Sequence, residues 1–416
     1  MKNTLFIEGG YPLQGQVRVS GAKNAGLVLM VASIMAEGET ILDNVPRIKD
    51  VEVLIQILED LGVRISWNED GSLSICPPSS GLKTQTSYEL SKKLRASNLL
   101  LGALLGSQGE AQVSLPGGCD IGSRPMDLHI KGVQALGAEV DVEYGYIYAT
   151  SKERSGSRVY LDFPSVGATE NIIMMAAKTP GQTVIENAAK EPEIVDLANF
   201  INSMGGRIRG AGTDVIKIEG VPTLTAGRYA IIPDRIEAGT YMIAAAITGG
   251  EILVENVIPT HLHPIIAKLQ ETGAQVEEVK QGVLVKAAQH ITPVDIKTLP
   301  YPGFPTDMQS QMMALLCHAQ GSSIIVENVF ENRFQIVDEL KRMGARIKVE
   351  GHTAVVEGGT RLSGAKVRAT DLRAGAALVL AALAADGVTE IEDAGHIFRG
   401  YEKIEDKLKS LGAKVR

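Results

Sequence analysis

Residues 134–140 read QALGAEV, and close variants of this segment occur five more times along the chain. The variants are EDLGVRI (59–65), NSMGGRI (202–208), QETGAQV (270–276), KRMGARI (341–347) and KSLGAKV (409–415). Their glycines are Gly62, Gly137, Gly205, Gly273, Gly344 and Gly412, separated by 75, 68, 68, 71 and 68 residues. This regularity indicates six copies of one structural unit. In each copy we expect the glycine to end an amphipathic helix in a left-handed conformation, with a strand directly after it.

A second set of glycines precedes the first, and each member is expected to open a strand. The set is Gly38, Gly109, Gly181, Gly250, Gly321 and Gly387. Each follows an apolar segment rich in small residues, namely 25–36, 97–107, 168–178, 238–248, 308–319 and 374–385. Such segments predict buried helices that approach their neighbours closely. Each unit therefore reads helix, strand, helix, strand, strand. An α/β fold follows, with three units in each of two similar domains and a break near residues 230–235.

The length and composition agree with this organisation. A chain of 416 residues suits two domains of about 200 residues, and two domains imply a cleft between them. The residue content, 44% hydrophobic, 22% charged and 4% aromatic, is that of an ordinary globular protein. A net charge of −8 and few aromatic side chains make nucleic acid an unexpected partner.

Several classes of chemistry lack their sequence signals. The first residues show no signal peptide, and no apolar run is long enough to span a membrane, so a reducing cytoplasm is the expected location. The three cysteines are widely spaced and form no C-x-x-C pair, which favours neither disulfides nor zinc. No P-loop, H-E-x-x-H or G-x-S-x-G motif is present. We therefore expect no metal and no cofactor.

Equivalent positions at the starts of the six apolar helices carry different side chains. They are Lys23, Arg95, Gly167, Glu237, Asp307 and Arg373. A cation is unfavourable beside the positive end of a helix dipole unless an anion joins it. Lys23, Arg95 and Arg373 therefore predict an anion site, although solvated first-turn residues are the alternative interpretation. Asp307 alone could be an ordinary first-turn acid.

The loop between the two glycines is longest in the second copy, where it reads LPGGCDIGSRPMDLH (115–129). Its glycines predict a mobile flap that carries Cys119, Arg124 and Asp127. Arg124 could lower the pKa of the Cys119 thiol and make it reactive or an effective proton donor. We expect Cys76 and Cys317 to be buried and inert instead. The matching loop of the sixth copy, DAGHIFRGYE (393–402), carries His396 and Arg399.

Specific motifs run in order along essentially the whole chain. They include VSGAKNAG (19–26), LRASNLLLGALL (94–105), PGGCDIGSRPMDLH (116–129), PSVGATENI (164–172), GFPTDMQSQMMALL (303–316), FENRF (330–334), TDLRAGAALVLA (370–381) and RGYEKIEDKL (399–408). Together they resemble the UDP-N-acetylglucosamine 1-carboxyvinyltransferases of the EPSP synthase family. The resemblance implies two inside-out α/β barrel domains of three repeats each. These would be residues 22–231, and residues 1–21 together with 232–416.

The resemblance also implies a reaction. Enolpyruvyl would pass from phosphoenolpyruvate to the 3′-hydroxyl of UDP-N-acetylglucosamine, with release of phosphate, as the first committed step of peptidoglycan synthesis. It would proceed by addition and elimination through a tetrahedral ketal, without a cofactor. Such a reaction needs a base for the hydroxyl proton, an acid for the methylene carbon, and cations for the phosphate and carboxylate.

The motif positions supply candidates for each role. Asp307 would be the base and Cys119 the acid, with Lys23 and Arg399 also catalytic. Phosphoenolpyruvate would be held by Lys23, Asn24, Arg124 and Arg399. UDP-N-acetylglucosamine would be held by Arg95, Arg124, Pro125, Met126, Asp127, Leu128, Ser165, Val166, Gly167, Asp307 and Val329. Asp371 and Arg373 would support the closed site. The antibiotic fosfomycin would alkylate Cys119.

Two alternatives remain at this point. The first is a synthase that enolpyruvylates shikimate 3-phosphate, which would share the repeats and the phosphoenolpyruvate chemistry but lacks a PGGC flap. The second is a catalytically silent nucleotide-sugar sensor that kept the fold. Lys23, Cys119, Arg124, Asp307 and Arg399 together favour an active enzyme.

Overall fold

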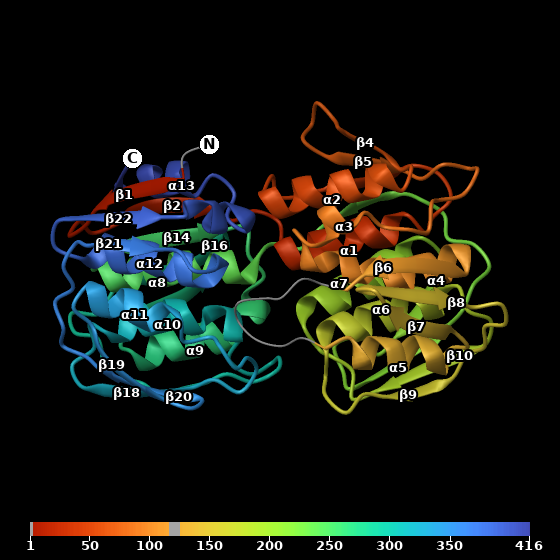
Figure 1. The fold of residues 1–416 in the computed structure, drawn as a ribbon. Helices are drawn as coiled ribbons and strands as arrows, with labels where there is room; N and C mark the ends of the chain where they lie inside the picture. Colours follow the sequence, from red (N-terminus) through yellow and green to blue (C-terminus); the bar gives the residue numbers. More distant parts are fainter. Residues whose placement is uncertain (1–2, 116–124) are drawn as a thin grey trace. The chain divides into compact units, whose positions relative to one another are not determined.

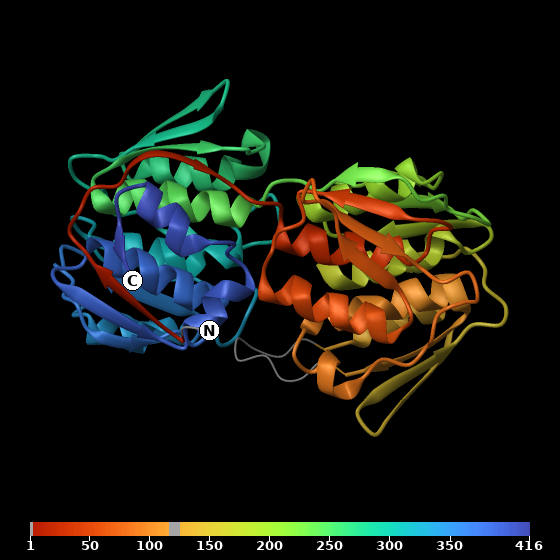
Figure 2. The ribbon, with the colours of Figure 1, turned by 90° about the horizontal axis from the view of Figure 1, so that it is seen from above.

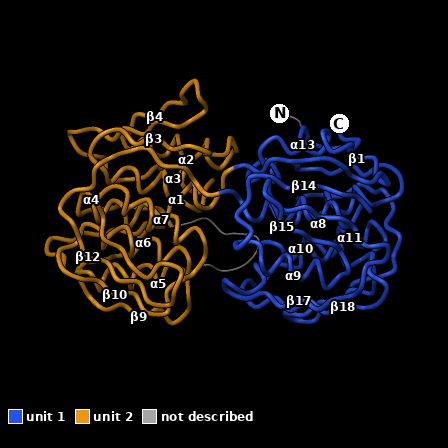
Figure 3. Tube along the Cα trace, turned by 180° about the vertical axis from the view of Figure 1, so that it is seen from behind, with its two compact units in different colours: residues 1–20, 119–123, 233–416 blue, residues 21–118, 124–232 orange. Residues whose placement is uncertain are grey.

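The computed structural model describes residues 3–115 and 125–416. The described chain divides into two compact units (Figures 1 and 3). Residues 21–115 and 125–232 form what we call the N-terminal unit, and residues 3–20 and 233–416 form the C-terminal unit.

The N-terminal unit contains three copies of one element order. The first copy comprises α1 (Lys23–Ser33), β3 (Thr40–Asp43), α2 (Lys49–Asp60), β4 (Arg64–Trp67) and β5 (Leu73–Cys76). The second comprises α3 (Tyr88–Ser91), the 3-10 helix η1 (Arg95–Leu99), α4 (Leu100–Gln108), β6 (Glu110–Ser114), α5 (Asp127–Ala135), β7 (Glu139–Glu143) and β8 (Tyr146–Thr150). The third comprises β9 (Arg158–Tyr160), α6 (Val166–Ala177), β10 (Gln182–Glu186), α7 (Pro192–Ser203), β11 (Arg207–Arg209) and β12 (Val215–Glu219), followed by β13 (Arg228–Ala230).

The C-terminal unit repeats this order three times. It starts with β1 (Thr4–Glu8) and β2 (Gln14–Arg18), and its first copy comprises α8 (Arg235–Thr248), β14 (Glu251–Glu255), η2 (Pro259–Leu262), α9 (His263–Glu271), β15 (Gln275–Val279) and β16 (Gly282–Lys286). The next comprises β17 (Ile296–Lys297), η3 (Thr306–Met308), α10 (Gln309–Leu316), β18 (Ser322–Val326), α11 (Ile336–Arg342), β19 (Arg346–Glu350) and β20 (Thr353–Glu357). The last comprises β21 (Lys366–Arg368), α12 (Leu372–Ala384), β22 (Val388–Glu392), η4 (Ala394–Arg399), α13 (Ile404–Ser410) and β23 (Lys414–Val415). The predicted unit of helix, strand, helix, strand, strand is confirmed in five copies, and the sixth lacks the final strand.

The apolar helices form the centre of each unit, and the strands lie around them (Figure 2). Every residue from Leu100 to Gly106 of α4 is buried, and so is every residue from Arg373 to Leu383 of α12. Small residues allow the close helix contacts that this burial requires. At Gly102 an added Cβ would lie 2.2 Å from the Asn171 carbonyl oxygen on α6. The buried helices predicted from composition are therefore the core of the fold.

Most sheets share one strand order. The first strand lies at one edge and pairs in parallel with the strand that follows the apolar helix. The two strands of an antiparallel hairpin complete the sheet. This order occurs in β13-β3-β5-β4, β9-β10-β12-β11, β2-β14-β16-β15 and β17-β18-β20-β19. The sheet β6-β8-β7 has three strands, and a parallel bridge from Gln85 to Gln112 lies where its edge strand would be. In the last sheet, β21-β22-β1-β23, the sixth copy ends after one hairpin strand. Strand β1 takes the missing place and pairs antiparallel with both β22 and β23.

The glycines after the amphipathic helices have the predicted conformation. All six have φ between 95° and 100°, in the left-handed region. Glycine is favoured there because it has no Cβ to clash with the backbone. This local signal therefore fixed the ends of the amphipathic helices correctly.

Candidate functional site

Lys23 is the first residue of α1, where the sequence predicts an anion site. Its Nζ lies 2.7 Å from Oδ2 of Asp50, a buried residue in the first turn of α2. The neighbouring Asn24 is exposed. The cation beside the positive helix end is therefore balanced by a carboxylate of the same unit, which offsets the unfavourable dipole interaction.

The N-terminus of α6 carries three of the predicted nucleotide residues. Ser165 caps the helix, because its hydroxyl accepts a hydrogen bond from the Ala168 N–H at 3.3 Å. Val166 and Gly167 form the first turn, and all three are partly exposed. Backbone N–H groups in a first helical turn have no intrahelical partner, so this end of α6 can bind an anion.

The start of α5 carries a second group of predicted residues. Pro125 and Asp127 are exposed and Leu128 is partly buried, whereas Met126 is only 6% exposed and its sulfur accepts a hydrogen bond from Asn98 Nδ2 at 3.5 Å. The Met126 side chain therefore belongs to the core. Arg95 begins η1 and is half-buried.

His129 connects this group to α6. Helices α5 and α6 pack together, and a Cβ added at Gly167 would lie 2.9 Å from His129 Cε1 and 3.4 Å from Nε2. The pKa of His129 is lowered to about 4, first by burial and then by the charge of Arg95, with Asp127 acting in the opposite direction. Arg95, Asp127 and Gly167 thus lie near one imidazole, which is neutral at pH 7.

Asp307 is held by two arginines of the C-terminal unit. Arg333 Nη2 donates to its Oδ1 at 2.6 Å, and Arg373 Nη2 donates to its Oδ2 at 2.9 Å. Both arginine side chains are nearly fully buried, while the Asp307 side chain is 27% exposed. The carboxylate is therefore fixed in orientation and remains accessible.

Arg373 is positioned by the helix cap of α12. Oδ1 of Asp371 accepts hydrogen bonds from the N–H groups of Arg373 and Ala374, at 2.8 and 3.0 Å. Burial is the largest single influence and lowers the pKa of Arg373. The charges of Asp307, Tyr401 and Asp234 and the hydrogen bond to Asp307 together outweigh it, so the pKa is raised above its ordinary value. Asp371, Arg373 and Asp307 thus form one connected set.

The buried carboxylate of Glu327 connects Val329 with Thr306, the residue before Asp307. Oε1 of Glu327 accepts the Val329 N–H at 2.8 Å, and its Oε2 accepts the Thr306 hydroxyl at 3.0 Å. Sequence reasoning assigned no role to Glu327 or Arg333. The available signal was the FENRF motif (330–334), which contributed to the resemblance without a role for its arginine.

The remaining predicted residues are Arg399, Arg124 and the three cysteines. Arg399 is the last residue of η4 and is half-buried. Cys119 and Arg124 lie outside the described residues. Cys317 is buried as expected, and burial raises the pKa of its thiol to about 12. Cys76 is only partly buried, which corrects the expectation. It is the last residue of β5, and Nη2 of Arg64, on the edge strand β4, donates to its sulfur at 3.4 Å.

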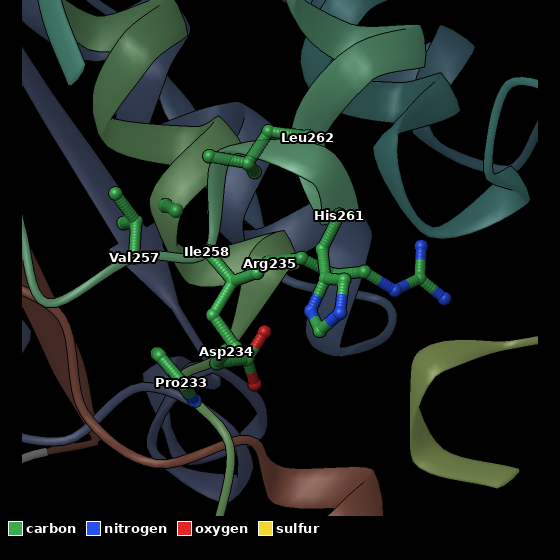
Figure 4. Close-up of a pocket in the computed structure, with 8 residues that line it drawn as sticks. Pro233, Asp234, Arg235, Val257, Ile258, His261 and Leu262 are labelled. Atoms are coloured by element: carbon green, nitrogen blue, oxygen red, sulfur yellow. The ribbon is translucent and has the colours of Figure 1, made fainter. Parts of the chain in front are cut away.

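A pocket at the start of α8 contains none of the predicted residues (Figure 4). It is lined by Pro233, Asp234, Arg235, Ala238, Val257, Ile258, His261 and Leu262. The Asp234 carboxylate caps α8 by accepting from the N–H groups of Ile236 and Glu237. The Arg235 guanidinium extends away from that carboxylate, so the two charges do not converge on one ligand (Figure 4).

Two other classes of site have no counterpart in the part of the chain that the structure describes. Within residues 3–115 and 125–416, no group of three or more His, Cys, Asp or Glu side chains could hold a metal ion. No helix in this part of the chain is both long enough and apolar enough to cross a lipid bilayer.

Comparison with solved structures defines the fold class. The enolpyruvyl transferase NikO from Streptomyces tendae matches with a TM-score of 0.90 and 26% identity, covering 99% of this chain and 98% of that one. An EPSP synthase from Acinetobacter baumannii matches with a TM-score of 0.76 and 20% identity over the full length of both chains. The predicted α/β fold of repeated units in two domains is therefore that of the enolpyruvyl transferases.

Sequence comparison gives the family. The family model of EPSP synthase (3-phosphoshikimate 1-carboxyvinyltransferase) matches residues 7–408. The chain therefore belongs to the EPSP synthase family. UDP-N-acetylglucosamine 1-carboxyvinyltransferase 1 of Caldanaerobacter subterraneus subsp. tengcongensis is 54% identical in sequence, and the alignment covers 100% of this chain and 99% of the relative. The protein of the same name from Staphylococcus aureus (strain bovine RF122 / ET3-1) is 52% identical, covering 99% of this chain and 98% of its own. The resemblance drawn from the motifs is confirmed.

Proposed function

We propose that this chain transfers enolpyruvyl from phosphoenolpyruvate to the 3′-hydroxyl of UDP-N-acetylglucosamine and releases phosphate, a step of peptidoglycan synthesis. The observation that carries this proposal is full-length similarity, at 51% to 54% identity, to proteins named UDP-N-acetylglucosamine 1-carboxyvinyltransferase. The reaction fits a site built from a carboxylate, several cations and a helix N-terminus.

Asp307 is the base in this proposal. Arg333 and Arg373 favour the ionised carboxylate, which is the form that can accept the hydroxyl proton, and they fix its direction. The hydroxyl oxygen then forms a bond to C2 of phosphoenolpyruvate. Cys119 gives a proton to C3, so that the ketal carries a methyl group.

The second half of the reaction reverses the protonation. The bond from C2 to the phosphate oxygen breaks, the Cys119 thiolate takes a proton back from C3, and enolpyruvyl remains on the sugar. The proton that Asp307 accepted passes to the departing phosphate. Lys23, Asn24, Arg124 and Arg399 hold the phosphate and carboxylate while charge moves between them. Lys23 is already paired with Asp50, so the bound anion shares this cation with a carboxylate.

The nucleotide-sugar is assigned to the residues that the sequence motifs select. The diphosphate binds the first turn of α6 at Ser165, Val166 and Gly167, with Arg95 and Arg124 supplying charge. The start of α5, from Pro125 to Leu128, contacts uracil, and Met126 contributes through its backbone because its side chain is buried. Val329 contacts the sugar, while Asp371 and Arg373 support Asp307.

A phosphate-release assay separates this activity from the family's other reaction. Purified protein with phosphoenolpyruvate is given UDP-N-acetylglucosamine or shikimate 3-phosphate as the acceptor. We expect phosphate release only with the nucleotide-sugar. Release with shikimate 3-phosphate alone would assign the chain to the other branch, and no release with either acceptor would favour the sensor alternative.

Two finer assignments belong to the same proposal. Fosfomycin alkylates Cys119, because a small phosphonate can occupy the cations that hold phosphoenolpyruvate. The enzyme acts in the cytoplasm, where thiols stay reduced.

A further inference from the structure

A buried polar network in the N-terminal unit lies outside the roles assigned so far. It connects Asn171 on α6 with Gly102 on α4, Asn98 on η1 and His129 on α5. Asn171 is completely buried, and His129 and Asn98 are 5% and 6% exposed. Buried polar groups need all their hydrogen bonds, so the network restricts the arrangement of its donors and acceptors.

The orientation of the Asn171 amide follows from a backbone group. The Gly102 N–H can only donate, and it lies 2.6 Å from Asn171 Oδ1. The Asn171 NH2 group therefore faces its two other partners. One is the Asn98 carbonyl oxygen at 3.2 Å, which can only accept, and the other is His129 Nδ1 at 2.8 Å.

This orientation determines the tautomer of His129. Because the Asn171 NH2 group donates to Nδ1, that nitrogen must be unprotonated, and a neutral ring then carries its proton on Nε2. A protonated ring would place an N–H against an NH2 group. The lowered pKa of His129, caused by burial and Arg95 against the opposing charge of Asp127, agrees with a neutral ring.

The protonated edge of the ring lies against the N-terminus of α6. Gly167 leaves room for it, since a Cβ there would lie within 3.4 Å of both Cε1 and Nε2. We propose that Asn171 is a positioning residue that holds His129 as the Nε2–H tautomer and thereby presents a neutral donor beside the first turn of α6. The inference rests on the proposed function, which assigns the nucleotide diphosphate to that turn.

The first test is made on the wild-type protein, and a variant serves only to assign the signals. Nitrogen-15 NMR of histidine-labelled protein reports which ring nitrogen carries a proton, and the spectrum of His129→Gln identifies the His129 signals. We expect an unprotonated Nδ1 and a protonated Nε2 from pH 6 to 8, with the Nε2 signal shifting when UDP is added. A protonated Nδ1 in the wild type overturns the inference, whichever reaction the enzyme catalyses.

The second test uses Asn171→Asp, whose carboxylate accepts from the Gly102 N–H but cannot donate to His129. The neutral ring should then carry its proton on Nδ1, which turns the Nε2 lone pair toward the diphosphate. We expect KM for UDP-N-acetylglucosamine to rise about tenfold at pH 8, the effect of one lost hydrogen bond to a charged group. Because the new carboxylate favours the cationic ring, the KM ratio to wild type should fall as the pH is lowered.

The control is the double variant Asn171→Asp with His129→Gln, because glutamine does not titrate. Its KM should show no such recovery at low pH. A KM for Asn171→Asp that equals the wild type, or that is raised equally at every pH and in both variants, overturns the positioning role. Failure of the proposed function itself would appear separately, as absence of phosphate release by the wild type.

Discussion

Arg333 and Asp307 meet in a direct hydrogen-bonded ion pair, with 2.6 Å between Nη2 and Oδ1. They lie on opposite sides of α10 and β18 in the sequence, yet the Arg333 side chain is only 3% exposed and points its charge at the candidate base. A charge so deeply buried requires a partner of opposite charge. The contact therefore neutralises the Arg333 guanidinium and also fixes the orientation of the Asp307 carboxylate.

Replacing Asp307 by Asn should mainly lower kcat. An amide of the same shape keeps the site filled but cannot accept the hydroxyl proton, and loss of a general base costs about 10²- to 10⁴-fold. Steady-state kinetics of phosphate release would measure the change, with the exposed Asp338→Asn on α11 as the matched control. A rise confined to KM would contradict the role as base.

Replacing Lys407 by Met should destabilise the C-terminal unit. Lys407 Nζ contacts Oε1 of Glu237, a residue of the first turn of α8 that is 2% exposed. Removing one partner of a buried ion pair costs about 3–5 kcal/mol. Lys414→Met removes an exposed pair with Glu8 and should have a much smaller effect in urea unfolding.

The loss in Lys407→Met should depend on pH. Burial raises the pKa of Glu237 to about 7, with Lys407 opposing the rise. A raised acid pKa means that the folded state binds more protons than the unfolded state above about pH 4.5, so this group destabilises the fold as the pH increases toward 7. Without Lys407 the pKa should rise further. The difference in unfolding free energy from wild type should therefore be larger at pH 8 than at pH 5, and an equal loss at both would count against it.

Gly102→Ala should destabilise the N-terminal unit. The new methyl group would lie 2.2 Å from the Asn171 carbonyl oxygen, so α4 and α6 must separate. Overpacking of this kind costs about 1–3 kcal/mol, and more where backbone must move. Gly26→Ala in α1 is the control, because its Cβ would meet only side-chain atoms at 3.5 and 3.6 Å. Equal urea midpoints for the two variants would show that the helix contact can relax.

The thiols should differ in reactivity toward alkylation. Burial raises the pKa of Cys317 to about 12, so almost no thiolate forms at pH 8. We expect iodoacetamide to leave Cys317 unlabelled until the protein is unfolded, and fosfomycin to label Cys119 alone. Peptide mass spectrometry of the wild type and of Cys119→Ser would locate the adducts. Fosfomycin labelling at Cys76 or Cys317 would contradict the assignment.

Sequence reasoning was most successful where the signal was local. The glycine-terminated helices, the buried helices rich in small residues and the repeated element order are all confirmed. It was less successful with burial, since Cys76 is partly exposed. It gave no role to Arg333, Glu327 or Asn171. The hydrogen-bond partners of Arg333 and Asn171 lie at least 26 and 42 residues away, and Glu327 joins nearby Val329 to Thr306, which lies 21 residues away.

By itself, the sequence determined the six units, their elements and the family to which the chain belongs. The units and their elements depend on the backbone preference of glycine and on the spacing of apolar residues, which act within one or two helical turns, and the family follows from the motifs. Only the tertiary structure decided which charges meet, as in Lys23 with Asp50 and Asp307 with Arg333. It also decided that β1 completes the last sheet. Such pairings depend on the packing of whole helices and sheets, because ions and strand edges interact over a few ångströms that no local pattern specifies.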